Sequence, residues 1–269
     1  MRLFRKEGFS MARLTKRDVY GAQGIVFDGD HIVTPNGEHV TELLKDGNTK
    51  VGKTVFTWST LPGNFEHNVT VNGEHMMIKG TCACNCDGCY AQRGRYNADN
   101  VKESNAIHTI LIREYPDFVK RAIVAQIRAS KIKLVRIHAS GDFEDSHVEP
   151  WREIISACPN TRFWTYTKNE NAQHAFDDLP NMHVVPSIIL NRGYNFGHCD
   201  YILETYLRLK DMGASVYICK CGFDDNAAHC NTCEACSKYD YVLFLEHSTS
   251  YNGKADPLYN TLKDIVMAQ

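Results

Sequence analysis

The sequence contains eleven cysteines, and nine of them lie in two short groups, residues 82–89 and residues 219–236. A thiolate is a nucleophile and a ligand for soft metal ions, so clustered cysteines point to a bound metal ion or iron–sulfur cluster. Residues 1–13 are basic and lack the apolar stretch of a secretory signal. We therefore expect a cytoplasmic protein whose cysteines bind metal; secretion with disulfides is the alternative.

The first group has the pattern C-x3-C-x2-C, formed by Cys82, Cys86 and Cys89. Three thiolates on a short loop can hold three corners of a [4Fe–4S] cluster and leave the fourth iron open for a ligand. Cys84 could supply a fourth thiolate, for zinc or for a closed cluster. Four ligands packed into residues 82–89 would make a strained tetrahedral cage. We therefore predict a three-cysteine cluster that excludes Cys84.

The second group supplies four thiolates in the pattern C-x8-C-x2-C-x2-C, formed by Cys221, Cys230, Cys233 and Cys236. Four thiolates are enough to close either a structural zinc site or a second [4Fe–4S] cluster. Cys219 could take the place of Cys221, and His229 is a weaker candidate ligand. The sequence does not decide between zinc and a second [4Fe–4S] cluster for this group.

The elements that must position these cysteines divide into two regions. Residues 1–80 contain short apolar runs and turn residues, including the hairpin signal Asn72-Gly73, and predict an N-terminal β-rich cap. Over residues 81–269, helix-type and strand-type patterns alternate. Repeated βα units imply a parallel sheet, open or closed, with catalytic groups at the carboxyl ends of its strands. We predict one α/β domain here, with the cysteines of 219–236 in a C-terminal insertion.

Within this domain, the run Lys133–Ala139 predicts a strand that ends in Ser-Gly-Asp. Alternation would place Arg136, His138 and Ser140 on one face of that strand. We interpret His138 as a hydrogen-bonded core histidine rather than a catalytic base. Tyr166 and Lys168 end the next strand and could share a cavity with that face.

Composition and charge exclude several classes of protein. The chain is 43% apolar and 23% charged, as in ordinary globular proteins, which excludes wholesale disorder. Its 30 basic and 32 acidic residues give a net charge of −2, so there is no strong sign of nucleic-acid binding. The sequence has no apolar run long enough to span a membrane, and we expect no membrane partner.

Several stretches resemble the phage gene product 88-like family, which is related to the radical S-adenosylmethionine superfamily. They cover about residues 50–247 and are Lys53–Pro62, Cys89–Ala91, Val135–Phe143, Trp164–Lys168 and the second cysteine group. The link to the superfamily is the C-x3-C-x2-C loop followed by a strand that ends in Ser-Gly-Asp-Phe. The resemblance implies a partial (β/α) barrel of radical-SAM type.

The resemblance also implies a chemistry. The cluster at Cys82, Cys86 and Cys89 would bind the amino and carboxylate groups of S-adenosylmethionine through its open iron. One electron from the cluster would then cleave the sulfonium and yield methionine and a 5′-deoxyadenosyl radical, which abstracts hydrogen from an unknown substrate. The implied partner is an electron donor such as a ferredoxin or flavodoxin. If the protein is phage-encoded, the compartment is the host cytoplasm.

Cofactor contacts are carried over residue by residue. The backbone of Ser140, Gly141 and Asp142 would contact the methionine amine, and Ser187 the carboxylate or ribose. Asp142 stands where the superfamily has a glutamate. Where the superfamily often has an aromatic residue before the third cysteine, this chain has Gly88, so Tyr90 would take the adenine contact.

Two functions of other classes compete with this one. The first is a zinc-stabilised binding module with nucleic acid as a candidate ligand, which the charge balance disfavours. The second is a noncatalytic iron–sulfur redox protein. Iron content distinguishes the zinc module from the other two, and cleavage of S-adenosylmethionine distinguishes those two from each other.

Overall fold

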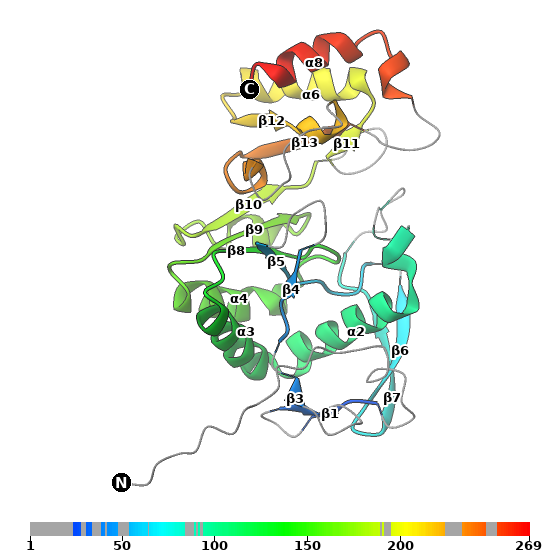
Figure 1. Cartoon of the computed structure of the whole chain (residues 1–269), viewed down its shortest axis with the longest axis vertical. Helices are drawn as coiled ribbons and strands as arrows, with labels where there is room; N and C mark the ends of the chain where they lie inside the picture. The colour runs from blue at the N-terminus through cyan, green and yellow to red at the C-terminus, as the bar shows by residue number, and fades with distance from the viewer. Residues whose placement is uncertain are drawn as a thin grey trace.

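A computed structural model describes residues 24–27, 31–33, 39–40, 42–47, 54–63, 65–83, 89, 91, 94–188, 190, 195–223, 233–245 and 252–269. The predictions for Cys84, Cys86, Tyr90, His229 and Cys230 concern residues outside these ranges. Figure 1 shows a larger body around the strands labelled β4 to β10 and a smaller one that contains α6 and α8.

The larger body is built on a five-stranded sheet of order β10-β9-β8-β5-β4. Its strands are β4 (Lys45–Asp46), β5 (Val55–Thr57), β8 (Leu134–Ile137), β9 (Arg162–Thr167) and β10 (Met182–Pro186). All neighbours pair in parallel except β4, which is antiparallel to β5. β-branched and aromatic residues dominate the central strands, as expected where both faces of a parallel sheet are covered.

Helices connect the parallel strands. They are η2 (Gly94–Asn97), α2 (Asp99–Glu114), α3 (Pro116–Ser130), α4 (Asp145–Ala157) and α5 (Glu170–His174). The helix α3 starts with Pro116, whose fixed φ suits the first turn, and ends at Lys131 in the left-handed conformation. In Figure 1, α3 and α4 lie together beside the sheet, and α2 lies nearer the β6–β7 hairpin.

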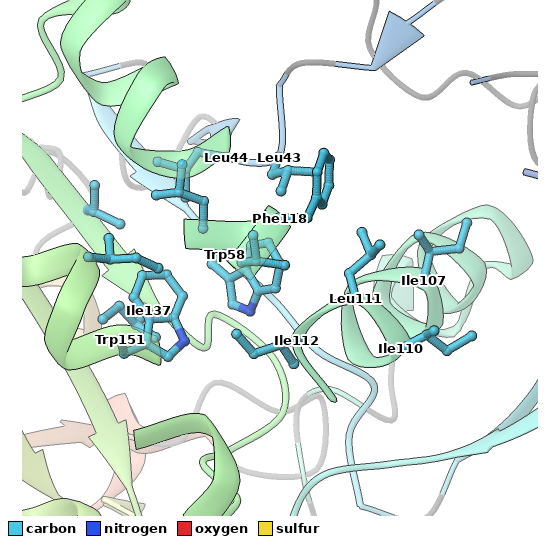
Figure 2. Packing of buried hydrophobic residues seen from close by; sticks show 14 of the residues in the cluster. Leu43, Leu44, Trp58, Ile107, Ile110, Leu111, Ile112, Phe118, Ile137 and Trp151 are labelled. Atoms are coloured by element: carbon cyan, nitrogen blue, oxygen red, sulfur yellow. The ribbon is translucent and has the colours of Figure 1, made fainter. Parts of the chain in front are cut away.

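The main hydrophobic core lies between these helices and one face of the sheet. Trp58 is fully buried at its centre, stacked on His108 with ring centroids 4.2 Å apart and edge-on to Trp151 at 5.8 Å. Figure 2 shows Trp58 with Trp151 on one side and Leu111 on the other. This core holds the carboxyl end of β5 firmly against the helices.

Short strands flank the larger body. β1 (Val26–Phe27), β2 (Ile32–Val33) and β3 (His39–Val40) form one small sheet, and β6 (Glu66–Val71) and β7 (Glu74–Lys79) form a hairpin. Both turn residues of the hairpin, Asn72 and Gly73, have positive φ, as the Asn-Gly pair predicts. Their buried residues share the main core, and β5 lies inside the central sheet. Residues before position 80 therefore help to build the body that carries the later strands.

The smaller body has its own sheet and core. Its strands β11 (Phe196–Gly197), β12 (Val216–Ile218) and β13 (Tyr241–Leu245) pair in parallel in the order β11-β13-β12. Its helical elements are α6 (Cys199–Asp211), η3 (Lys220–Gly222), η4 (Ala235–Ser237), η5 (Gly253–Ala255) and α8 (Tyr259–Met267). A second hydrophobic cluster joins α6 and α8 to this sheet.

Asn195 joins the two bodies. Its backbone amide donates to the Ile188 carbonyl just after β10, and its carbonyl accepts from the Phe244 amide of β13, at 2.8 and 2.7 Å. Its side-chain oxygen also accepts from the Ile188 amide at 2.6 Å. The strands that follow β10 are thus tied to the carboxyl end of the central sheet.

The fold is a mixed α/β arrangement in which the described strands form four separate sheets. The parallel strands and their helical connections agree with the expected βα pattern. The partial barrel of radical-SAM type and the boundary after residue 80 stay predictions. None of the helices in the described ranges has the length and apolar character needed to cross a membrane.

Candidate metal and cofactor site

The segment Ser140–Asp142 lies at the carboxyl ends of β5 and β8. Beyond their regular pairing, the two chains continue side by side: the Ala139 amide donates to the Trp58 carbonyl at 2.9 Å, and the Thr60 amide to the Ser140 carbonyl at 3.0 Å. The segment is therefore held by backbone hydrogen bonds at the edge of the sheet where ligands of α/β proteins bind.

Gly141 is required by its surroundings. It has a φ of +83°, and a Cβ built on it would lie 2.0 Å from the Thr60 hydroxyl oxygen and 2.9 Å from that of Thr81. The two hydroxyls are hydrogen-bonded to each other at 2.9 Å. A side chain at position 141 would thus collide with a buried threonine pair. Spacing alone did not point to either threonine.

Asp142 is 2% exposed, and its carboxylate is bound by donors of this chain. It accepts hydrogen bonds from the Thr167 hydroxyl at 2.6 Å and from the Lys168 amide at 3.0 Å. The Phe143 amide donates at 2.8 Å and the Lys168 ammonium at 3.4 Å. These bonds tie the end of β8 to the end of β9 and surround a buried negative charge with donors.

Cys82 lies close to this carboxylate, and Cys89 lies close to Cys82. Burial raises the pKa of the Cys82 thiol to about 12, with smaller contributions from the nearby Asp142 and Cys89, while Lys168 acts in the opposite direction. The Thr81 amide, next to Cys82, donates to the Leu61 carbonyl at 2.9 Å and holds the start of the loop against the chain that follows β5. Two of the three predicted cluster ligands, Cys82 and Cys89, therefore lie near each other, and Cys82 lies beside Asp142.

Ser187 belongs to the same edge of the sheet. Its amide donates to the Thr167 carbonyl at 2.8 Å, while the Thr167 hydroxyl donates to Asp142. The structure thus places Ser140, Gly141, Asp142 and Ser187 at the carboxyl ends of neighbouring strands. For Tyr90 the structure provides no position.

His138 differs from expectation. It has a φ of +53° and is buried, but neither ring nitrogen has a hydrogen-bond partner among the described residues. Burial lowers the pKa of its imidazole well below the usual value, and His147 and Lys168 act in the same direction. His138 is thus a core residue, as predicted, but the described residues give its ring no hydrogen bond, and the ring packs against Phe143 at 4.4 Å.

The left-handed backbone at His138 also breaks the alternation expected for this strand. His138 contacts Phe143 of the main core, whereas the Arg136 guanidinium lies 5.7 Å from the Tyr166 ring centre, in a separate cluster. A positive φ redirects the chain at His138, so strand alternation does not predict which face the side chains on the two sides of this residue occupy. The two side chains do not share one face.

The described cysteines of the second group gather beside β12 and η4. The Cys219 amide donates to the Leu243 carbonyl at 2.8 Å. The adjacent Cys221 side chain and burial raise the pKa of the Cys219 thiol, and Cys236 contributes further. The Tyr217 hydroxyl lies 3.6 Å from the Cys233 sulfur. Cys219 therefore lies near both Cys221 and Cys236.

This second group packs on the central sheet, on the face away from the main core. Cys236 contacts the cluster of Val55, Leu134 and Trp164, whereas the neighbours Val135 and Phe163 belong to the main core. Successive residues of a strand point to opposite faces, which explains the division. Glu234 binds Arg162 at 2.7 Å, and His183 Nε2 lies 2.7 Å from the Tyr239 carbonyl oxygen, so the segment is anchored to β9 and β10.

The strand β9 and its extension meet both cysteine groups. Tyr166 packs beside Cys236, and Lys168, two residues later, binds Asp142 next to Cys82. Two residues of extended chain span roughly 7 Å. Tyr166 and Lys168, two positions apart, thus link the surroundings of the two cysteine groups.

Within the described ranges, no three histidine, cysteine or acidic side chains are grouped so that they could hold a metal ion. Cys86 and Cys230, which complete the two predicted ligand sets, lie outside those ranges. The ligand sets remain predictions. The chemistry of the donors that do gather, thiols beside buried hydroxyls and one carboxylate, suits a thiolate-bound metal.

These residues define an α/β protein with a parallel sheet, one cysteine group at the carboxyl end of β8 and a second cysteine group on the face of the sheet away from the main core. A family model described as Gene product 88 matches residues 42–239 of the chain. The chain therefore belongs to the gene product 88 family, which confirms the resemblance to that phage family. No match was found among curated proteins or among solved structures.

Proposed function

We propose that this chain is an iron–sulfur protein of the radical S-adenosylmethionine type, with a [4Fe–4S] cluster at Cys82, Cys86 and Cys89. What supports the proposal is the proximity of Cys82 to Asp142, in the Ser140–Asp142 segment at the carboxyl ends of β5 and β8, with Cys89 near Cys82. When bound, the cluster and S-adenosylmethionine would supply one-electron cleavage of the sulfonium. The proposed setting is the host cytoplasm, with a ferredoxin or flavodoxin as electron donor.

The chain would bind and orient the amino-acid end of the cofactor. That end carries an ammonium and a carboxylate, and the buried Asp142 carboxylate lies 3.4 Å from the Lys168 ammonium. Lys168 is only 22% exposed, so both charges act where water screens them weakly. Ser140 and Gly141 would offer backbone groups, and Ser187 a hydroxyl, along the same edge; Tyr90 would contact the adenine.

One observation favours the noncatalytic alternative. All four donors that surround the Asp142 carboxylate come from the chain itself, so the residue already has a complete structural role. A cofactor amine would have to replace or share the contact with Lys168. An iron–sulfur protein without its own catalysis needs no such exchange.

Anaerobic reconstitution followed by metal analysis and calorimetry tests the proposal. We expect about eight iron atoms per chain if both cysteine groups hold clusters, or about four with one zinc. Reconstituted protein should bind S-adenosylmethionine and, once reduced, form 5′-deoxyadenosine slowly. If the protein contains only zinc, the zinc-stabilised binding module replaces the proposed enzyme. If full clusters form but S-adenosylmethionine does not bind, the noncatalytic iron–sulfur protein replaces it.

A further inference from the structure

Two tyrosine hydroxyls lie among the thiols of the second cysteine group. The Tyr217 hydroxyl is 3.6 Å from the Cys233 sulfur, within hydrogen-bonding distance for sulfur. The Tyr166 hydroxyl is buried, and the Cys236 thiol is its side-chain neighbour. One hydroxyl already has a sulfur partner, and the other has a sulfur beside it.

Both hydroxyls are held in place by regular structure. Tyr217 is the middle residue of β12, pairs with Val242 of β13, and its ring lies 5.0 Å from that of Tyr239. Tyr166 is in β9 and packs against Phe244 at 6.0 Å. Side chains fixed by strand pairing and ring contacts lose little further freedom when they form a hydrogen bond.

A thiol is a weak hydrogen-bond acceptor, whereas a metal-bound thiolate carries negative charge and accepts strongly. Hydrogen bonds to ligand sulfurs orient the ligands and tune the metal. The Arg136 guanidinium, 5.7 Å from the Tyr166 ring centre, adds positive charge on the same side. A buried hydroxyl beside the Cys236 sulfur would form a much stronger hydrogen bond if Cys236 became a thiolate.

We propose that Tyr217 and Tyr166 are positioning residues that donate O–H hydrogen bonds to the metal-bound thiolates of Cys233 and Cys236 and so strengthen metal binding at the second cysteine group. This inference rests on the proposed metal site of that group. It is independent of S-adenosylmethionine chemistry at the first group and holds equally for zinc and for a cluster, because thiolate is the ligand in both.

The test uses the full chain with Cys82→Ala and Cys89→Ala, so that thiolate-bound metal belongs to the second group. Zinc affinity is measured anaerobically by competition with a chromophoric chelator. We expect Tyr217→Phe and Tyr166→Phe each to lower the affinity about 10-fold or more. Tyr239→Phe is the matched control, because it removes a hydroxyl from the same cluster, and among the described residues this hydroxyl has no hydrogen bond to sulfur.

Cobalt(II) gives a readout that a merely structural role would not move. Loss of an O–H···S bond leaves more charge on sulfur, so the thiolate-to-cobalt charge-transfer band should shift to lower energy in both phenylalanine variants and stay in place in Tyr239→Phe. Thermal melting of the metal-free chains identifies a variant that fails to fold. In that case, the comparison uses the phenylalanine variant of the other tyrosine. Unchanged affinity and spectrum in folded variants, or no zinc binding by the parent chain, would overturn the inference. Failure to bind S-adenosylmethionine would affect only the proposed function.

Discussion

The Asp142 carboxylate accepts hydrogen bonds from both the backbone amide and the side-chain ammonium of Lys168, at 3.0 and 3.4 Å. The two residues follow adjacent parallel strands, so this contact closes the gap between the ends of β8 and β9. Because Cys82 lies in the electrostatic field of both residues, the same pair sets the charge beside the first cysteine group. Several testable consequences depend on this arrangement.

Removal of the Asp142 charge should destabilise the fold. Asp142→Asn keeps the shape but weakens the bonds from Thr167 and Lys168, and it leaves the Lys168 ammonium without its carboxylate. Hydrogen bonds to charged groups contribute about 1.5–3 kcal/mol, so we expect a loss of about 2 kcal/mol in urea unfolding. The exposed Asp177→Asn should change stability by less than about 0.5 kcal/mol. Equal effects of both variants would contradict the structural role of Asp142.

The threonine pair beside Gly141 should make a side-chain methyl group at this position strongly destabilising. Gly141→Ala would place Cβ 2.0 Å from the Thr60 hydroxyl oxygen at a φ of +83°. Gly213 has almost the same φ, +82°, and open space around its Cβ position. Gly213→Ala should therefore cost only the strain of a left-handed alanine, about 1 kcal/mol, and Gly141→Ala clearly more, when both are measured by urea unfolding.

A second substitution separates collision from strain at this position. Thr60→Ala removes the oxygen nearest to the added methyl group. In the double variant, part of the Gly141→Ala cost should disappear, which gives a non-zero coupling energy between positions 60 and 141. Additive costs would show that the threonine pair does not constrain the glycine.

The Glu144 carboxylate should stabilise the fold at neutral pH and lose this contribution in acid. Burial alone would raise the pKa of its carboxyl, but His147 and Arg113 outweigh burial and lower the pKa from its usual value near 4.5 to about 2. Arg113 Nε donates to Glu144 Oε2 at 2.7 Å. A carboxyl with a lowered folded-state pKa stabilises the fold above its unfolded value, and this contribution is lost as the pH falls from about 4.5 toward 2. The Glu144 side chain is 29% exposed, and screening by solvent reduces the size of the effect.

Glu144→Gln should remove that part of the pH dependence. Urea unfolding between pH 6 and pH 3 should show a smaller loss of stability in the variant than in the wild type. At pH 6 the variant should be the less stable protein, because it lacks the ion pair with Arg113. Parallel stability curves for the two proteins would exclude Glu144 as the source.

The cysteine spacing predicts different results for neighbouring substitutions. Cys86→Ala should abolish the iron–sulfur absorbance after anaerobic reconstitution in a chain whose second group is blocked by Cys233→Ala and Cys236→Ala. Cys84→Ala should retain it, because the C-x3-C-x2-C frame is complete without that residue. Equal loss in both variants would indicate a closed four-cysteine site with no iron open to a cofactor.

The sequence by itself determined the features that depend on neighbouring residues. The spacing of Cys82, Cys86 and Cys89 defines a candidate cluster loop, and Asn72-Gly73 predicts the observed hairpin turn because both residues tolerate positive φ. The patterns over Lys133–Ala139 and Arg162–Thr167 place strands that the structure contains as β8 and β9. Each of these depends on short-range stereochemistry, which a local pattern records.

The tertiary structure alone decided which distant residues meet. Thr60 and Gly141, or Tyr217 and Cys233, come together through strand order, register and the packing of the connecting helices. Even within one strand, the left-handed His138 separated Arg136 from the residues that follow, because a single positive φ redirects the chain. Such contacts depend on long-range packing free energy summed over the whole core, and no window of local sequence contains that sum.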